Sequence, residues 1–151
     1  MTEQGSLITD EMRQCIGEPR TPHVVQVEHG AIAVFASAIG DANPLFTNDI
    51  HARGTRYGGI TAPPTFLRTV SGEGRELFEE SGLENVLDGG SEWSYFNPVY
   101  SGDRITVITT ILDLTERDGR LGRMVFVVSE AVYTNQFDQI VAKQRSTIIR
   151  Y

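Results

Sequence analysis

Hydrophobic positions follow two different spacings along the chain, and the change between them comes near residue 89. In the first half, Ile32, Phe35, Ala36 and Ile39 recur at the three-and-four spacing of one buried helical face. In the second half, long runs are rich in β-branched and aromatic residues, which is typical of strands. Helices followed by a meander of strands predict an α+β fold with a long antiparallel sheet wrapped around a central helix.

Turn residues set the expected limits of each element. A short helix or arm over residues 6–16 precedes a strand over 23–28 and a helix over 29–39. The second, central helix opens at Ala62-Pro63-Pro64-Thr65, because proline is tolerated in a first turn, and it ends at Gly82. Gly72 and Gly74 inside it mark a bend or the close approach of another group. The strands of the second half are expected at 91–96, 104–114, 123–134 and 139–151.

The connection between the two helices, residues 40–62, is the first candidate for function. Loops of this length inside a small domain are usually functional or cover something. Gly40 stops the first helix, and Asp41, Asn43 and Pro44 then force a turn where the apolar pattern ends. A carboxylate and an amide are therefore expected at the mouth of a core.

The amino-acid composition and net charge exclude some classes of protein but do not indicate a reaction. A chain of 151 residues with 40% hydrophobic and 22% charged residues is expected to form one domain. Its net charge of −7 argues against a nucleic-acid groove or an anionic membrane surface as partner. The lone Cys15 allows neither a disulfide nor a thiolate metal cluster, and no residues have metal-ligand spacing, so neither a metal nor a cofactor is expected. Without a long apolar run or a secretory pattern, a cytoplasmic location is predicted.

Three segments resemble one known family. Gly40-Asp41-Ala42-Asn43-Pro44-Leu45-Phe46 is similar to the motif of the MaoC-like, (R)-specific enoyl-CoA hydratases, with Phe46 where that family has His. The segment 57–66 resembles the FAS1-like dehydratase domain subgroup, and Pro98 to Asp103 resembles the family's strand entry. The resemblance covers nearly the whole chain. It implies a single hot-dog domain over residues 1–151.

The chemistry implied by the resemblance needs an acid–base pair and a polarised N–H donor for the thioester oxygen. Asp41 stands at the position of the family's Asp, where it either orients water or simply caps the turn. Phe46 cannot transfer a proton, so it packs in the core, lines an acyl tunnel, or does both. Pro63 and Pro64 have no N–H to offer the thioester, although Thr65 or Phe66 retains one.

Other polar residues carry weaker hypotheses. His51 is a candidate non-standard base, and the alternative is an exposed, solvated histidine. The side chains of Arg53, Arg56 and Arg68 are expected to meet carrier phosphates or simply to lie exposed. The acidic run that contains Glu73 and Glu76 predicts a solvated helix face, or the carboxylate of a thioesterase.

Together these features predict an acyl-pocket-forming subunit of an enoyl-thioester hydratase or 3-hydroxyacyl-thioester dehydratase, a hydro-lyase of fatty acid metabolism that depends on a catalytic partner chain. Its ligand would be an acyl-CoA or acyl carrier protein thioester, and its partner a second hot-dog subunit, identical or different. A non-catalytic acyl-CoA-binding module and a self-sufficient homodimer that uses His51 remain alternatives. The expected substrate contacts are Asn43, Phe46, Gly59, Thr65 and Phe66.

Overall fold

The computed structural model describes residues 5–70, 76–78 and 81–151. Some of the described helical elements are α-helices (α), and others are short stretches of 3-10 helix (η). In chain order the described elements are α1 (Asp10–Gln14), β1 (His23–Gln26), α2 (His29–Ala38), η1 (Pro44–Phe46), α3 (Asp49–Arg53), η2 (Pro64–Thr69), η3 (Glu76–Phe78), β2 (Val86–Tyr95), β3 (Arg104–Gly119), β4 (Gly122–Thr134) and β5 (Ile140–Arg150).

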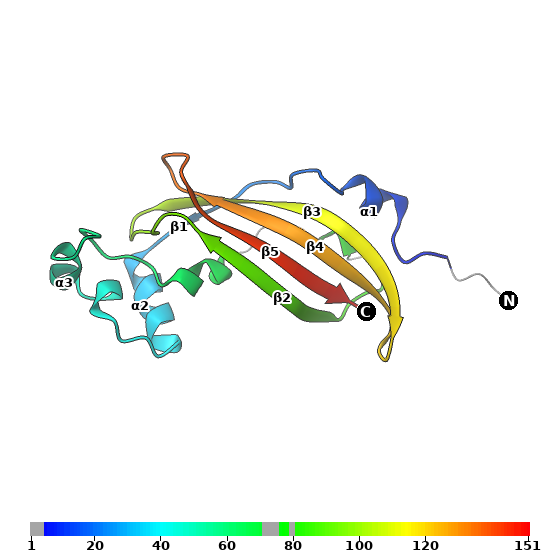
Figure 1. The fold of residues 1–151 in the computed structure, drawn as a ribbon, viewed down its shortest axis with the longest axis horizontal. Coiled ribbons are helices and arrows are strands. Elements are labelled where there is room, and N and C mark those ends of the chain that lie inside the picture. Colours follow the sequence, from blue (N-terminus) through cyan, green and yellow to red (C-terminus); the bar gives the residue numbers. More distant parts are fainter. Residues whose placement is uncertain (1–4, 71–75, 79–80) are drawn as a thin grey trace.

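The strands form one antiparallel sheet in the order β1-β3-β4-β5-β2, so β1 and β2 are its edges. Figure 1 shows that the long strands curve together, with α2 and α3 at one end of the sheet. The predicted α+β layout with a long antiparallel sheet is therefore confirmed. The strand over 23–28 and the helix over 29–39 are also confirmed, to within two residues at each end.

One face of β4 explains how the strand alternation builds the core. Val125, Val127, Ala131 and Tyr133 point to the same side and are buried, as period-two spacing requires. Ser129, in the middle of this row, is only half-buried, and its Oγ lies 3.1 Å from Oγ of Ser146 on β5. A polar pair thus sits between two apolar clusters, one beneath α2 and η2 and the other beneath α1.

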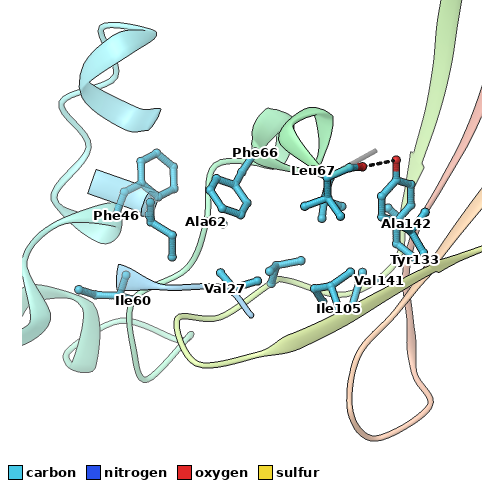
Figure 2. Packing of buried hydrophobic residues seen from close by; sticks show 14 of the residues in the cluster. Val27, Phe46, Ile60, Ala62, Phe66, Leu67, Ile105, Tyr133, Val141 and Ala142 are labelled. Atoms are coloured by element: carbon cyan, nitrogen blue, oxygen red, sulfur yellow. Dashed lines mark hydrogen bonds between the residues drawn. The ribbon is translucent and has the colours of Figure 1, made fainter. Parts of the chain in front are cut away.

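The first of these clusters positions the candidate site. Figure 2 shows a continuous row of buried side chains from Phe46 and Ile60, past Phe66 and Leu67 on η2, to Tyr133 on the sheet. The Phe35 ring on α2 meets the Phe66 ring edge-on, with 5.7 Å between centroids. Helix α2 and η2 are therefore fixed to the sheet by the same packed layer.

The prediction of a continuous second helix is wrong for the described part of that segment. The segment after Pro63 forms only the 3-10 turns of η2, and Val70 has extended geometry, with φ −101° and ψ 95°. Thr69 Oγ1 donates a 2.7 Å hydrogen bond to the carbonyl oxygen of Phe66, so a side chain competes with the backbone for this acceptor. Other residues singled out for this helix lie outside the described residues: Gly72, Glu73 and Gly74.

Two strands differ from their expected limits because each contains a bulge. Strand β2 begins at Val86 rather than at residue 91, with its register shifting between Asp88 and Ser91. Gly90 has φ +114°, and a Cβ on Gly89 would lie 2.9 Å from the carbonyl oxygen of Thr147. Strand β3 likewise runs on past residue 114 to Gly119, with its own register shift between Ile111 and Asp113.

The N-terminal arm packs on the sheet. Its helix α1 is shorter than the predicted 6–16, and it begins after Thr9, whose side chain accepts the N–H of Met12. Ile8 and Met12 are buried in the second apolar cluster. Ile16 then forms an isolated bridge to Ile111 on β3, which ties the arm along the strand.

Candidate functional site

The turn after α2 is built by two side chains that bond to their own backbone. Gly40 has φ +71°, the left-handed geometry that ends a helix most easily with glycine. One carboxylate oxygen of Asp41 then accepts the N–H of Asn43 at 3.0 Å, and Oδ1 of Asn43 accepts the N–H of Leu45 at 3.0 Å. Both polar residues of the motif therefore shape the turn, which confirms the turn-forming interpretation of their geometry.

This turn has two faces that open onto different cavities. Asn43 and Phe46 face a cleft of about 640 Å³, whereas Asp41 faces a separate groove of about 330 Å³. Apart from Asp41, the groove is lined by small side chains and by glycine: Ala33, Ala36, Ser37, Gly40, Ala42 and Thr47. Asp41 itself is exposed. The motif's carboxylate and the residue at its histidine position thus line different cavities.

The cleft lies between the segment 43–67 and the end of strand β2. Its far wall comes from residues 95–99, and backbone hydrogen bonds hold the two walls together. The N–H of Ala62 donates to the carbonyl oxygen of Val99 at 2.8 Å, and the N–H of Ser101 donates to that of Ile60 at 3.0 Å. The lining is mostly apolar: Asn43, Leu45, Phe46, Arg56, Tyr57, Thr61, Ala62, Pro63, Pro64, Leu67, Tyr95, Phe96, Asn97, Pro98 and Val99.

Phe46 combines the two roles expected for it. Only 6% of the residue is exposed, and it belongs to the first apolar cluster while also lining the cleft. Pro63 and Pro64 line the cleft as well, and neither has an N–H. The N–H of Phe66 donates to the carbonyl oxygen of Pro63 at 2.8 Å, so this donor is already used within the chain.

The remaining predicted residues do not meet at this cleft. Phe66 is buried in the core beneath it, while Thr65 is exposed and Gly59 is half-buried, and none of the three is among the residues that line the cleft. His51 is exposed on α3, in the single helical turn that the sequence predicts. It too lies outside the lining of both the cleft and the Asp41 groove.

Several residues that line the cleft were not predicted from the sequence. Tyr95 and Phe96 stand at the end of edge strand β2, with 47% and 57% of each residue exposed. Adjacent aromatic residues are typical of strands in general, so the sequence held no signal that singled out this wall. The segment that begins at Pro98 was noted only as a strand entry, yet Asn97 and Pro98 complete the cleft.

The described residues hold no group of three or more His, Cys, Asp or Glu side chains placed to bind a metal ion. Among the helices of the described chain, none is long and apolar enough to cross a membrane.

A long curved antiparallel sheet packed on α2 and η2, with a Gly-Asp-x-Asn-Pro turn beside an apolar cleft, defines a hot-dog protein of the hydratase and dehydratase class. Residues 14–144 match the model of the FAS1-like dehydratase domain region. The chain belongs to this family. The expected MaoC-like hot-dog fold is thereby confirmed.

Individual relatives agree with this assignment. A UPF0336 protein of Thermobifida fusca is 31% identical over 85% of this chain and 86% of its own length. A probable enoyl-CoA hydratase alpha subunit of Thermomonospora curvata is 27% identical over 90% of this chain, but the match spans only 48% of that protein. A chain of the ChsH1-ChsH2 complex from Mycobacterium tuberculosis has a TM-score of 0.74 and 23% identity, over 89% of this chain and 84% of that chain.

Proposed function

We propose that this chain forms the acyl-binding half of an enzyme that interconverts a trans-2-enoyl thioester and an (R)-3-hydroxyacyl thioester. In hydration, water gives its hydroxyl oxygen to C3 and a proton is added at C2; dehydration reverses both steps. The observation that carries the proposal is Phe46, a buried ring in the cleft wall at the motif position of the proton-transferring histidine. A second hot-dog chain would therefore bring the imidazole.

The cleft suits an acyl thioester. Leu45, Phe46 and Leu67 supply apolar surface for an acyl chain. Asn43 adds a polar contact, because its Oδ1 is used by the turn and its Nδ2 makes no hydrogen bond within the described part of the chain. We assign that Nδ2 to a substrate oxygen, and Phe46 to the acyl chain.

The proposed position of the partner follows from the edge of the sheet. Strand β2 leaves one row of backbone groups unpaired, and exposed edges of this kind favour pairing with another sheet. Tyr95 and Phe96 at its end also line the cleft, so a second sheet along β2 would cover them and narrow the opening. Relatives described as an alpha subunit and as part of a two-component complex support a partner. The partner is either a second copy of this chain or a different hot-dog chain.

The proposal is tested by turnover with and without a partner. The purified chain should bind crotonyl-CoA but leave its absorbance unchanged, because no imidazole reaches the cleft from this chain. Adding a hot-dog subunit that carries the intact Gly-Asp-x-Asn-Pro-x-His motif should restore hydration. Robust turnover by the isolated chain would overturn the proposal. If His51→Ala then abolished that turnover, the self-sufficient homodimer would take its place.

A non-catalytic acyl-binding module is the second candidate. The observation in its favour is that the Asp41 carboxylate faces the groove and is engaged in the turn, away from the cleft. Such a module would bind the thioester yet show no turnover with any hot-dog companion. The same reconstitution therefore separates it from the subunit proposed above.

A further inference from the structure

One feature of the cleft is a single charged side chain among the described residues that line it. Among the described residues that line it, all are apolar or uncharged polar except Arg56. The whole chain carries a net charge of −7, so an isolated cation in an uncharged cleft is not a consequence of a generally basic surface. A cation in such a place favours an anionic group on the ligand.

The other two arginines expected near this loop are already neutralised. Nη2 of Arg53 lies 2.8 Å from Oδ2 of Asp49, and Nη2 of Arg68 lies 3.4 Å from Oδ2 of Asp88. Arg56 makes no ion pair with any carboxylate in the part of the chain that the structure describes. Of the three candidates for an anion, the structure leaves Arg56 uncompensated.

Arg56 is also held in place by its neighbours. Its Nη2 donates a 2.7 Å hydrogen bond to the Tyr57 hydroxyl, and the guanidinium carbon lies 4.9 Å from the centre of the Tyr57 ring. The hydrogen bond to Tyr57 raises the pKa of Arg56. The N–H of Tyr57 donates in turn to Oγ1 of Thr55, whose hydroxyl donates to the carbonyl oxygen of Ala52 at the end of α3. The contacts with Tyr57 therefore orient the guanidinium of Arg56, which is exposed.

We propose that Arg56 binds the phosphate of a 4′-phosphopantetheine arm, the group that coenzyme A and acyl carrier protein have in common. This inference rests on the proposed function, since it places the carrier of the same thioester. The planar guanidinium pairs with two phosphate oxygens at once, which a lysine cannot do. Tyr57 acts as a positioning residue that holds the guanidinium toward the cleft.

A ligand series tests the inference on the 151-residue chain by isothermal titration calorimetry. The probes share one acyl group and differ only in the carrier: acyl-pantetheine without phosphate, acyl-4′-phosphopantetheine with one phosphate, and acyl-CoA with the complete nucleotide. The wild-type chain should bind the second about tenfold more tightly than the first, the size expected of a hydrogen bond to a charged group. Equal affinity for these two probes would overturn the inference.

Variants identify the residue. Arg56→Gln should bring acyl-4′-phosphopantetheine down to the affinity of acyl-pantetheine, while the affinity for acyl-pantetheine itself stays unchanged. Arg53→Gln is the matched control, because Arg53 is an exposed arginine at the end of α3 that is already paired with Asp49, and it should leave all three affinities unchanged. Tyr57→Phe should weaken only the phosphate-bearing probes, by about two- to fivefold, because the guanidinium loses its orienting hydroxyl.

The remaining outcomes separate this inference from the function on which it rests. If the wild-type chain binds none of the probes, the proposed function fails and this inference fails with it. If all probes bind and Arg56→Gln changes nothing, only the phosphate site is wrong. If Arg56→Gln weakens acyl-CoA alone, the arginine contacts a nucleotide phosphate, and the assignment to the phosphopantetheine arm is overturned.

Discussion

The turn after α2 presents two faces that differ in burial and in chemistry. On the cleft side, Asn43, Leu45 and Phe46 border a cavity of about 640 Å³, and Phe46 is anchored in the core. On the groove side, the exposed Asp41 borders a smaller cavity whose lining includes Ala33, Ala36 and Ala42. Side chains only five positions apart in sequence thus face different surroundings.

This difference explains how the turn forms although Phe46 stands where the family motif has histidine. The two hydrogen bonds that the side chains of Asp41 and Asn43 accept from backbone N–H groups shape the turn and need no imidazole. Position 46, in contrast, faces the core and the cleft, where a phenylalanine adds apolar contact. The turn therefore depends on one side chain from each side, Asp41 and Asn43, whereas Phe46 packs in the core and lines the cleft.

The largest effect is expected on the cleft side. Phe46→Ala should lower the free energy of unfolding by about 3–5 kcal/mol, because it removes a buried ring and leaves a cavity. Chemical denaturation measures the change. Ile50→Ala on α3, where the isoleucine is 87% exposed, is the control and should change stability by less than about 0.5 kcal/mol. Equal effects of the two substitutions would show that the cleft side is not anchored in the core.

A second effect depends on pH and comes from the same apolar cluster. Burial raises the pKa of Tyr133 to about 12 from an ordinary value of 10.0. The folded state therefore favours the neutral phenol, and this contribution is complete below pH 10. It is lost as the pH rises from about 10 to about 12, since the unfolded chain releases the proton first.

The expected loss over that window is about 2 kcal/mol, from two pH units at about 1.4 kcal/mol each with some allowance for solvent. Equilibrium unfolding at a series of pH values measures it. Tyr133→Phe removes the titrating group and should flatten the decline in this window, although other residues still contribute. A wild-type and a variant curve of the same slope would contradict the burial of the phenol.

The sequence contained the layout and the turn, but not the way in which the turn divides two cavities. Alternation along residues 123–134 was enough to place β4, and the Asp41 and Asn43 side chains were enough to predict a turn. The continuous second helix was predicted because Phe66, Leu67 and Val70 have helical spacing, but η2 is 3-10 and Val70 is extended. Apolar residues spaced by three or four fit both geometries, so the pattern could not separate them.

The cleft residues were missed for a different reason. Tyr95, Phe96 and Asn97 are far from the motif in sequence, and only the pairing of β2 with β5 brings them to the cleft wall. Contacts set by strand pairing over such distances leave no local pattern. His51 shows the reverse, because it follows the motif closely in sequence and yet lies outside the cleft lining.

A smaller effect is expected from the amide of the cleft side. Asn43→Ala should cost about 1 kcal/mol of stability, because the N–H of Leu45 loses its acceptor at the start of η1. Asn43→Asp keeps an acceptor oxygen and should retain most of that stability, but it replaces the Nδ2 donor. If Asn43 contacts the substrate, both variants should weaken thioester binding. Binding that follows stability alone would reduce Asn43 to a turn-forming residue.

The smallest effect is expected on the groove side, from Asp41→Asn. The amide oxygen can still accept the N–H of Asn43, so the stability should change by less than about 0.5 kcal/mol. In the reconstituted complex, turnover should also stay within about threefold of wild type, because the carboxylate faces the groove and the proposed partner supplies the proton-moving group. Asp41→Ala, which lacks the acceptor, should cost about 1 kcal/mol and act as the structural control.

A loss of turnover of more than about a hundredfold in Asp41→Asn, with stability unchanged, would instead give Asp41 a role in proton transfer. The two faces of the turn would then act together in catalysis, and the division drawn between them would fail.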